Sequence, residues 1–376
     1  MKIPFLRLTP DSDELSEEIS QAFARVLQRG NFILGEEVEA FERDWAEYCE
    51  AKGAVGVANG TDAITLALTA LNVGKGDEVI TTPLSAAYTA LAITGAGARP
   101  VFADIDEKTF NLNPEQIEKA ITPRTKAIVP VHLYGQTTNI EAVCEIAKRR
   151  NLRVIEDAAQ AHGARFDGKA CGFSSDAATF SFYPTKNLGA LGDGGAIISN
   201  DENFLQKARA LRQGGHAEAM RANLIGRNSR LDEMQAAFLR VKLKKLDQWN
   251  NQRRELAEIY FEKLKDVSHL LPFVSDKAEH VFHLFVIRHE RRDELKDFLA
   301  GRGIETLIHY PYLLHEQEIF RAPEQKSLPV AEKIHKEILS LPLYPQMKNA
   351  EIETICEAIS EFENESVSVL SHHANR

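Results

Sequence analysis

The sequence has few cysteines and no pattern that would tie them together. Its 376 residues include four cysteines, Cys49, Cys144, Cys171 and Cys356, which are widely spaced and form no CxxC pair. Such spacing is typical of reduced, mostly structural thiols rather than of a zinc site or a disulfide framework. We therefore expect no metal.

Concentrated basic charge and long apolar runs are also missing. The formal net charge is −10, from 45 basic and 55 acidic residues, and no dense cluster of lysine and arginine occurs. Because nucleic acids and anionic membranes attract such clusters, we expect neither as a partner. No run approaches the roughly 20 apolar residues of a membrane span, and the first ten residues, MKIPFLRLTP, lack the apolar core of a signal peptide. These features predict a cytoplasmic protein.

What is present from about residue 53 to residue 200 is an alternation of short apolar runs with segments of helical periodicity. The runs are AVGVA, EVITTP, PVFADI, AIVPVHLYG, RVIEDAA, ATFSFYP and GAIIS. This alternation predicts an α/β fold with a large, mostly parallel sheet and crossover helices. Such sheets bind ligands beyond the carboxyl ends of their strands, where Gly60, Asp157, Ser181 and Lys186 fall.

The rest of the chain predicts a second, smaller domain, because 376 residues exceed the size at which one hydrophobic core stops growing. Apolar residues spaced three or four apart predict a long helix over 231–267, kinked near Trp249. HVFHLFVIR predicts a strand, and RRDELKDFLAGRG and a segment near 349–362 predict helices. The expected division is a large domain over 1–245, a small α+β domain over 246–366 and a flexible tail over 367–376.

Lys186 lies between an apolar, strand-like run and a glycine-rich stretch, in FSFYPTKNLGALGDGG. A solvated lysine and a dinucleotide-binding loop are the ordinary interpretations of these two features. The glycines, however, follow the lysine and precede a strand instead of a helix, which argues against a dinucleotide loop. A lysine that emerges from a buried strand is desolvated, which lowers its pKa and makes it a better nucleophile toward an aldehyde. Lys186 is therefore a candidate for imine formation with pyridoxal phosphate (PLP).

A bound PLP ring would require a carboxylate near its nitrogen and an aromatic face. Asp157 ends the run RVIED and can supply the carboxylate, although an acid at this place can also cap the next helix. Tyr88 in PLSAAYTALAI begins a helix after another strand and can supply the face, although alone it would be a core tyrosine.

The phosphate of PLP would require backbone N–H groups at the start of a helix, together with a hydroxyl group. The segment VANGTDAITLALTAL offers a strand end, Gly60 and then Thr61 at the start of an amphipathic helix. We assign the contact to the backbone amides of Thr61 and Asp62 and expect the acidic side chain to point elsewhere. Ser181 adds a candidate hydroxyl. An ordinary capped helix is the alternative interpretation.

Five motifs occur in this order along the chain: NGTD, PLSAAYTA, IEDAAQAHGA, SFYPTKNLGALGDGGA and GRNSRLDEMQAAFL. Together they resemble the DegT/DnrJ/EryC1/StrS family of PLP-dependent nucleotide-sugar aminotransferases over essentially the whole chain. The resemblance implies a type I aminotransferase fold and a homodimer whose active sites are shared between subunits. It also implies L-glutamate as amino donor, 2-oxoglutarate as its product and a nucleotide-linked keto-sugar as acceptor.

By position in these motifs, the resemblance implies that Lys186 forms the imine with PLP and that Asp157 pairs with the ring nitrogen. It implies that Gln160 bonds the ring hydroxyl and that Tyr88 stacks on the ring. The implied phosphate contacts are Gly60, Thr61, Asp62 and Ser181, and the residue lent by the partner subunit is Asn228.

Two further segments concern the substrate. RGNFILGEEVEAFE resembles members that aminate C-3 of the sugar, which implies a dTDP-linked 3-keto-6-deoxyhexose as acceptor. IHYPYLLHEQ resembles the substrate-side segment HYPxPxHLQ, so His309, Tyr310 and His315 are candidates for contacting the nucleotide or sugar. Leu313 and Glu316 replace the usual proline and leucine of that segment, which leaves the sugar preference open.

For several side chains the sequence allows two different roles. Arg230 can clamp the donor carboxylate or form a structural salt bridge. His162 can support Asp157 by a hydrogen bond or can be a core histidine. His280 and His283 lie on the predicted strand HVFHLFVIR, where a spacing of three places them on opposite faces and argues against a metal site.

Three other functions remain open from the sequence. One is a C-4 aminotransferase acting on a dTDP- or UDP-linked 4-keto-6-deoxy sugar. Another is a non-catalytic PLP-binding regulator, which a fused DNA-binding segment or a lost lysine would indicate; neither is present. The third is a PLP-dependent dehydratase. Family members that dehydrate sugars carry histidine in place of the lysine, so Lys186 argues against it.

Overall fold

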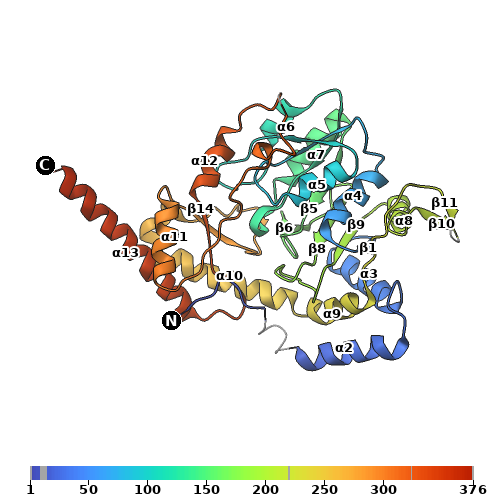
Figure 1. Ribbon diagram of the computed structural model, residues 1–376, viewed down its shortest axis with the longest axis horizontal. Helices are drawn as coiled ribbons and strands as arrows, with labels where there is room; N and C mark the ends of the chain where they lie inside the picture. Colours follow the sequence, from blue (N-terminus) through green and yellow to red (C-terminus); the bar gives the residue numbers. More distant parts are fainter. Residues whose placement is uncertain (1, 9–14, 219–220, 323, 375–376) are drawn as a thin grey trace.

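The computed structural model describes residues 2–8, 15–218, 221–322 and 324–374, and its centre is a seven-stranded sheet (Figure 1). The strands are β1 (Gly53–Val57), β2 (Glu78–Thr81), β3 (Arg99–Phe102), β4 (Thr125–Val129), β5 (Arg153–Asp157), β8 (Ala177–Ser181) and β9 (Gly195–Ser199). Their order across the sheet is β1-β9-β8-β5-β4-β2-β3. The five strands from β8 to β3 run parallel to one another. The strand β9 pairs antiparallel with both β8 and β1. The prediction of a large, mostly parallel sheet is confirmed.

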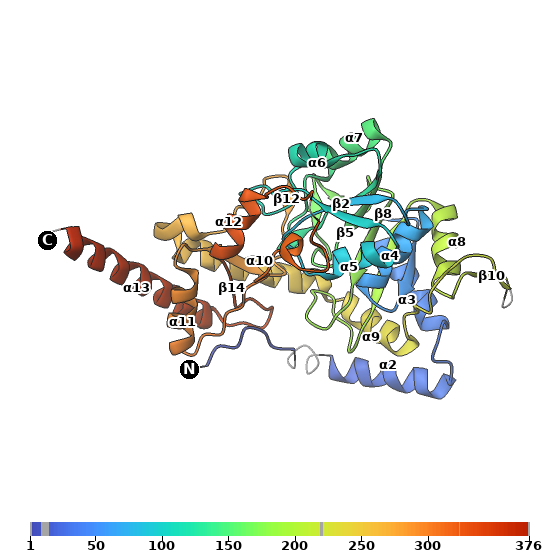
Figure 2. The same cartoon turned by 45° about the horizontal axis from the view of Figure 1, so that its top comes forward.

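Helices cover both faces of this sheet because side chains alternate between the faces along each strand. On β1, Val55 and Val57 join the core formed with α4 (Gly60–Ala70) and α8 (Glu202–Leu211), whereas Ala54 joins the core formed with α3 (Glu36–Tyr48). Further along the sheet, α6 (Pro114–Ala120) and α7 (Ile140–Arg150) pack over β2 and β4 (Figure 2). The helix α5 (Tyr88–Gly95) lies beside α4.

The prediction of one long, kinked helix over 231–267 is wrong, because the helix is broken in two. The structure has two helices, α9 (Glu233–Leu243) and α10 (Leu246–Lys263), followed by the 3-10 turn η2 (Lys265–Leu270). The break falls at Lys244 and Lys245, and Trp249 lies buried inside α10. Both helices are amphipathic with the same period, so periodicity alone does not reveal that α9 packs on α3 while α10 continues to a different core.

A second core lies in the C-terminal part of the chain. The strand β13 (Phe285–Arg288) pairs antiparallel with β14 (Ile338–Leu341), and both pack with α10, α11 (Arg292–Gly301) and α13 (Asn349–Ala374). The predicted strand HVFHLFVIR is shorter than expected. His280 and His283 are both buried but precede β13, so the two faces of a strand do not separate them. Their burial depends on packing against α10 and the sheet domain, which alternation does not encode.

The predicted domain division at 245–246 falls between α9 and α10 and remains a prediction. Residues near the N-terminus also reach the C-terminal core, where Ile3 forms a β-bridge with Ile304 and is fully buried. In Figure 1, α13 extends away from the rest of the molecule. The helix α13 includes residues 367–374 of the predicted tail, and the flexibility of that tail remains a prediction. Residues 375 and 376 lie outside the described residues.

The other elements are short or peripheral. They are α2 (Ser16–Arg29), η1 (Leu133–Gly135), β6 (Arg165–Phe166), β7 (Lys169–Ala170), β10 (His216–Glu218), β11 (Arg221–Ala222), β12 (Ala278–Glu279), η3 (Leu314–Glu316) and α12 (Pro329–Glu337). The helix α2 packs its apolar face on α9. Among the described helices, none is both long enough and apolar enough to cross a membrane.

Glu233, at the start of α9, holds the beginning of α3 in place. Its carboxylate accepts hydrogen bonds from the backbone N–H groups of Gly35 (2.8 Å), Glu37 (3.0 Å) and Val38 (2.8 Å). The first N–H groups of a helix have no acceptor within the helix, and negative charge is favourable at that end. Because Glu233 is only 2% exposed, water does not replace this acceptor.

We predict that Glu233→Ala lowers the free energy of unfolding by about 2–4 kcal/mol, because buried N–H groups lose their acceptor. Glu233→Gln keeps an amide oxygen at the same place and should lose less. Urea denaturation of the two variants and the wild type near neutral pH measures the difference. An alanine variant as stable as the wild type would contradict the capping role.

Candidate functional site

Two neighbouring parallel strands end in candidate site residues. Asp157 closes β5 and Ser181 closes β8, and the strand register pairs Asp157 with Thr179. Lys186 follows Ser181 after a turn in which its backbone N–H donates to the Tyr183 carbonyl at 2.8 Å. The structure thus brings Asp157 and Lys186 to one edge of the sheet, where their charges interact.

The Lys186 amine is desolvated. Burial lowers its pKa from 10.5 to about 8, although the nearby Asp157 carboxylate acts in the opposite direction. Two histidines around it remain neutral: burial, with the Lys186 charge as the second cause, lowers the pKa of His162 to about 3 and that of His309 to about 4. A pKa of about 8 leaves roughly one Lys186 amine in ten with a free lone pair at pH 7, many times more than an ordinary lysine, and a nucleophile or base requires that lone pair.

The start of α4 lies against the end of β8. The Asn59 side chain caps this helix by accepting a hydrogen bond from the Asp62 N–H at 2.8 Å. A Cβ atom on Gly60 would lie 2.7 Å from Ser181 Cβ, and one on Gly195 would lie 2.5 Å from the Asn59 carbonyl carbon. Because glycine occupies both places, the first turn of α4 and the Ser181 hydroxyl can form one cradle, which suits an anion.

The segment GRNSR runs beside this cradle. The Arg227 guanidinium lies 3.2 Å from the Asp62 carboxylate and donates to the Gly95 carbonyl at 2.7 Å. The hydroxyl of buried Ser229 accepts a hydrogen bond from the Ala58 N–H at 3.2 Å. The Asp62 carboxylate is thus paired with a positive charge beside the helix N-terminus. The sequence interpretation did not identify Arg227 or Ser229, although both lie within the quoted motif.

The next two motif residues, Asn228 and Arg230, flank Ser229. The Asn228 side chain is exposed, and its backbone forms a β-bridge with Gln213; Arg230 is half-buried. Thr61, in the first turn of α4, is also half-buried.

The start of α5 carries the exposed candidate Tyr88 and, directly after it, the buried residue Thr89. Tyr88 is 65% exposed, whereas the following residue, Thr89, is 2% exposed. The Thr89 hydroxyl donates to Asp157 Oδ2 at 2.7 Å, and the Ala159 N–H donates to Asp157 Oδ1 at 3.1 Å. Thr89 is a site residue that the sequence interpretation missed; its place directly after Tyr88 in PLSAAYTA was the available signal.

Gln160 connects the sheet edge to the C-terminal part of the chain. Its Oε1 accepts from the Tyr134 N–H at 2.7 Å, and its Nε2 donates to the Tyr310 hydroxyl at 2.8 Å. The Tyr134 hydroxyl donates to the His309 carbonyl, and His309 Nδ1 lies 2.9 Å from Ser340 Oγ. Burial and the Asp157 charge both raise the pKa of Tyr310, which keeps its hydroxyl protonated. His309 and Tyr310 therefore belong to the group around Lys186.

The other two histidine candidates, His315 and His162, pack against aromatic rings. His315 Nε2 lies 3.5 Å from Glu332 Oε1, and its ring is tilted against Phe102 with centroids 6.4 Å apart. His162 packs among the rings of Trp45, Phe180 and Phe182. Among the hydrogen bonds of the described residues, the side chain that supports the Asp157 carboxylate is Thr89 and not His162. The interpretation of His162 as a core histidine fits this placement.

One buried cluster has the composition of a metal site. His132, Glu156 and Cys171 place ligand atoms within 4.8 Å of one another. His132 Nδ1 accepts from the Thr138 N–H at 3.1 Å, so Nε2 carries the proton that points to Glu156 Oε2 at 2.7 Å. The other oxygen of Glu156 accepts from the Gly172 N–H and from Ser175. The cluster is therefore a closed hydrogen-bond network.

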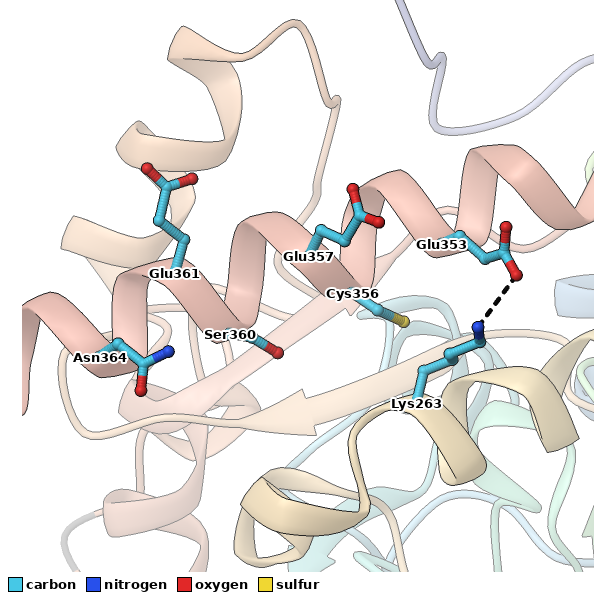
Figure 3. A pocket seen from close by; sticks show the side chains of 7 residues that line it. All are labelled: Lys263, Glu353, Cys356, Glu357, Ser360, Glu361 and Asn364. Carbon is cyan, nitrogen blue, oxygen red and sulfur yellow. Dashed lines mark ion pairs between the residues drawn. The ribbon is translucent and has the colours of Figure 1, made fainter.

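A hollow between α10 and α13 lies apart from these residues (Figure 3). Glu353, Glu357 and Glu361 project from α13 at intervals of four residues, and Lys263 at the end of α10 pairs with Glu353 at 3.0 Å. The excess of negative charge opposes binding of a phosphate-containing ligand. None of the candidate residues lines this hollow.

Comparison with known proteins identifies the family. The model of the DegT/DnrJ/EryC1/StrS aminotransferase family matches residues 13–360. The dTDP-3-amino-3,6-dideoxy-alpha-D-galactopyranose transaminase of Aneurinibacillus thermoaerophilus is 48% identical, over 96% of this chain and 99% of its own. A pleiotropic regulatory protein of Geobacillus stearothermophilus is also 48% identical, with the same shares of the two chains covered. The solved structure of S. venezuelae DesV in complex with a ketimine intermediate matches with a TM-score of 0.93 and 44% identity, over 96% of this chain and 98% of that chain.

The fold and the lysine-bearing sheet edge define a type I aminotransferase, as the resemblance implied. The chain belongs to the DegT/DnrJ/EryC1/StrS aminotransferase family. This family uses PLP as its cofactor. The residues present fit that group, since the glycine-lined cradle at Gly60 and Ser181, the buried carboxylate of Asp157 and the desolvated amine of Lys186 lie at one sheet edge.

We predict that Lys186→Met stabilises the PLP-free protein in a pH-dependent way. The folded-state pKa of about 8 lies below the ordinary value of 10.5, so folding disfavours the protonated amine. The wild type therefore carries a cost of up to about 3 kcal/mol below pH 8, and this cost disappears as the pH rises toward 10.5.

Urea denaturation of the PLP-free wild type and Lys186→Met across this pH range measures the difference. The advantage of the variant should be largest near neutral pH and should shrink in alkaline buffer. Lys52→Met, which changes an exposed lysine, serves as the control and should show no such slope. A pH-independent difference between Lys186→Met and the wild type would show that Lys186 is not desolvated.

Proposed function

We propose that this protein transfers the amino group of L-glutamate to the C-3 keto group of a nucleotide-linked 3-keto-6-deoxyhexose, with dTDP as the nucleotide. The desolvated Lys186 amine beside Asp157 is the observation that carries the proposal, because it provides a nucleophile and base at the edge of the sheet. Relatives that are 44% and 48% identical are named as transaminases of dTDP-3-amino sugars, which supports C-3 as the aminated carbon.

In this proposal the chain's own residues hold the cofactor at four places. Asp157 would accept a hydrogen bond from the protonated ring nitrogen and keep that nitrogen charged, and Gln160 Nε2 has a second hydrogen with which to bond the ring hydroxyl. Tyr88 covers one face of the ring. The phosphate is held at the start of α4 from Gly60, by the backbone amide of Thr61 and the Ser181 hydroxyl. The Asp62 amide joins them only by giving up its 2.8 Å hydrogen bond to the Asn59 side chain. When bound, PLP supplies an electron sink for the carbon that loses a proton.

Lys186 then acts as the base and acid. The amine of glutamate would take the place of Lys186 on the cofactor, and the freed Lys186 amine would remove the proton from the glutamate α-carbon and return it to C4′. The amino group would stay with the cofactor when water releases 2-oxoglutarate. The keto-sugar enters next, and Lys186 moves the proton in the opposite direction, so that the amino group reaches the sugar. The lowered pKa of Lys186 makes both protonation states accessible near neutral pH.

The substrate side is formed by the C-terminal part of the chain. Tyr310 and His309 are held against the sheet edge through Gln160 and Tyr134, which supports a role for them in contacting the sugar or nucleotide. Arg230 is a candidate for binding the donor carboxylate, because a guanidinium matches a carboxylate with two hydrogen bonds. His315 stays a prediction, with its 3.5 Å contact to Glu332 as the competing role.

The proposal includes a homodimer in which each subunit completes the partner's site. The exposed side chains of Asn228 and Tyr88 support this arrangement, since both occupy cofactor-binding motifs yet have open surroundings in one chain.

A cytoplasmic location is also proposed. Its support is that all four cysteines are free thiols, as expected in a reducing compartment.

We predict that Lys186→Ala abolishes turnover, because the variant lacks the amine that moves the proton at the reacting carbon. The visible absorption of PLP-loaded wild type should change on addition of L-glutamate. After desalting, it should return with a dTDP-3-keto-6-deoxyhexose and not with the 4-keto isomer. Lys186→Ala should show neither response at a comparable rate.

The alternatives predict different spectra. Recovery with the 4-keto isomer alone would establish a C-4 aminotransferase. A wild-type band that never responds to glutamate would favour a different donor or a PLP-binding regulator, a possibility raised by the 48% identity with the pleiotropic regulatory protein. Substantial turnover by Lys186→Ala would overturn the assigned role of this lysine.

The shared active site predicts complementation between two inactive variants. Lys186→Ala and Asn228→Ala homodimers should each have low activity. If Asn228 serves the partner's site, a mixed dimer has one site with both substitutions and one site with neither. Refolding an equal mixture should therefore restore about a quarter of wild-type activity, because half of the dimers are mixed and each has one intact site. No recovery above the two parents would contradict sharing through Asn228.

A further inference from the structure

The hydrogen bond from Thr89 to Asp157 joins two buried side chains from different elements. Thr89 is 2% exposed and Asp157 is 5% exposed, and the Thr89 Oγ1 to Asp157 Oδ2 distance is 2.7 Å. An ionised carboxylate can only accept, so the hydroxyl must donate its single proton to Asp157. A hydroxyl donating to an ionised acceptor makes a stronger hydrogen bond than one between two neutral groups.

Among the described residues, each oxygen of the Asp157 carboxylate accepts a hydrogen bond. Oδ2 accepts from Thr89 on α5, and Oδ1 accepts from the backbone N–H of Ala159 after β5. The torsion that turns a carboxylate about its Cβ–Cγ bond has broad minima, so one donor alone restrains the plane weakly. Two donors from separate elements fix this plane.

The Thr89 hydroxyl bonds outside its own helix. Later in α5, the Thr94 hydroxyl lies 3.0 Å from the carbonyl four residues earlier, as is common for threonine inside a helix. Thr89 lies in the first turn of α5, where the residue four positions earlier, Ser85, precedes the helix, and its hydroxyl donates across to β5. The hydroxyl therefore supports Asp157 and not the local helix.

We propose that Thr89 is a positioning residue that holds the Asp157 carboxylate in the plane required by the ring nitrogen of PLP. It acts through Asp157 and does not itself contact the cofactor. The inference rests on the proposed function, because it takes Asp157 as the partner of that ring nitrogen. Its neighbour Tyr88 is the proposed ring-stacking residue, so the start of α5 would set both the face of the ring and the orientation of its nitrogen partner.

The test compares Thr89→Val, which keeps the side-chain shape but removes the hydroxyl, with Thr89→Ser, which keeps the hydroxyl. Thr179→Val is the matched control. Thr179 is also buried and is paired with Asp157 in the strand register, but its hydroxyl donates to the Glu156 backbone carbonyl. Thr179→Val thus removes a comparable buried hydrogen bond without changing the donors to the Asp157 carboxylate.

Three measurements are made on each protein: the dissociation constant of PLP, the visible absorption of the loaded form against pH, and the rate of its single-turnover reaction with L-glutamate. Thr89→Val should slow the single turnover about 10- to 100-fold, as expected for loss of a hydrogen bond to a charged group. It should also weaken PLP binding and shift the pH dependence of the absorption. Thr89→Ser should recover most of each property, and Thr179→Val should resemble the wild type.

The outcomes separate this inference from the proposed function. A wild type that binds no PLP or does not respond to glutamate refutes the proposed function. A responsive wild type together with a Thr89→Val variant whose spectrum, PLP affinity and rate are unchanged refutes the role of Thr89. Equal losses in Thr89→Val and Thr179→Val would also refute it, since a general packing defect would then explain both. If Thr89→Val does not fold, Thr89→Ala removes the hydroxyl without adding a methyl group and takes its place.

Discussion

The site depends on how closely three backbone segments approach one another at Gly60 and Gly195. A Cβ atom at either glycine would lie within 2.7 Å of a neighbouring atom, on Ser181 in one case and on Asn59 in the other. Real Cβ atoms do not tolerate such distances, so a larger residue would push α4, β8 and β9 apart. The close approach places a helix N-terminus, a hydroxyl and the lysine loop at one edge of the sheet, and the anion cradle follows from that contact.

The same edge carries a charge that is costly to bury. Folding takes the half-buried Lys186 side chain partly out of water, and this burial lowers the pKa of its amine. The charge of Asp157 offsets part of the cost, and Asp157 is itself held by Thr89 and Ala159. The buried amine lowers the stability of the PLP-free protein, and it can gain or lose a proton near neutral pH.

Hydrogen bonds then bring the C-terminal part of the chain to this edge. Gln160 bonds Tyr310, and the residue after the lysine, Asn187, donates to Asn250 on α10 at 2.8 Å and to the Val281 carbonyl at 3.0 Å. The loop that carries the lysine is thus anchored to the segments that would meet the substrate. A substitution in α10 can therefore affect the position of the lysine without contacting a ligand.

Local residue patterns determined much of this protein. Each of the seven apolar runs overlaps a strand, and Asp157, Ser181 and Gly60 lie at strand ends or a helix start because polar and glycine residues interrupt the apolar pattern there. Only the tertiary structure decided which distant residues meet. The Thr89 hydroxyl reaches Asp157, 68 residues away, and α9 separates from α10 although both share one period. Periodicity indicates which side of a helix or strand faces the core, whereas a hydrogen bond between remote segments depends on how the whole sheet and its helices pack.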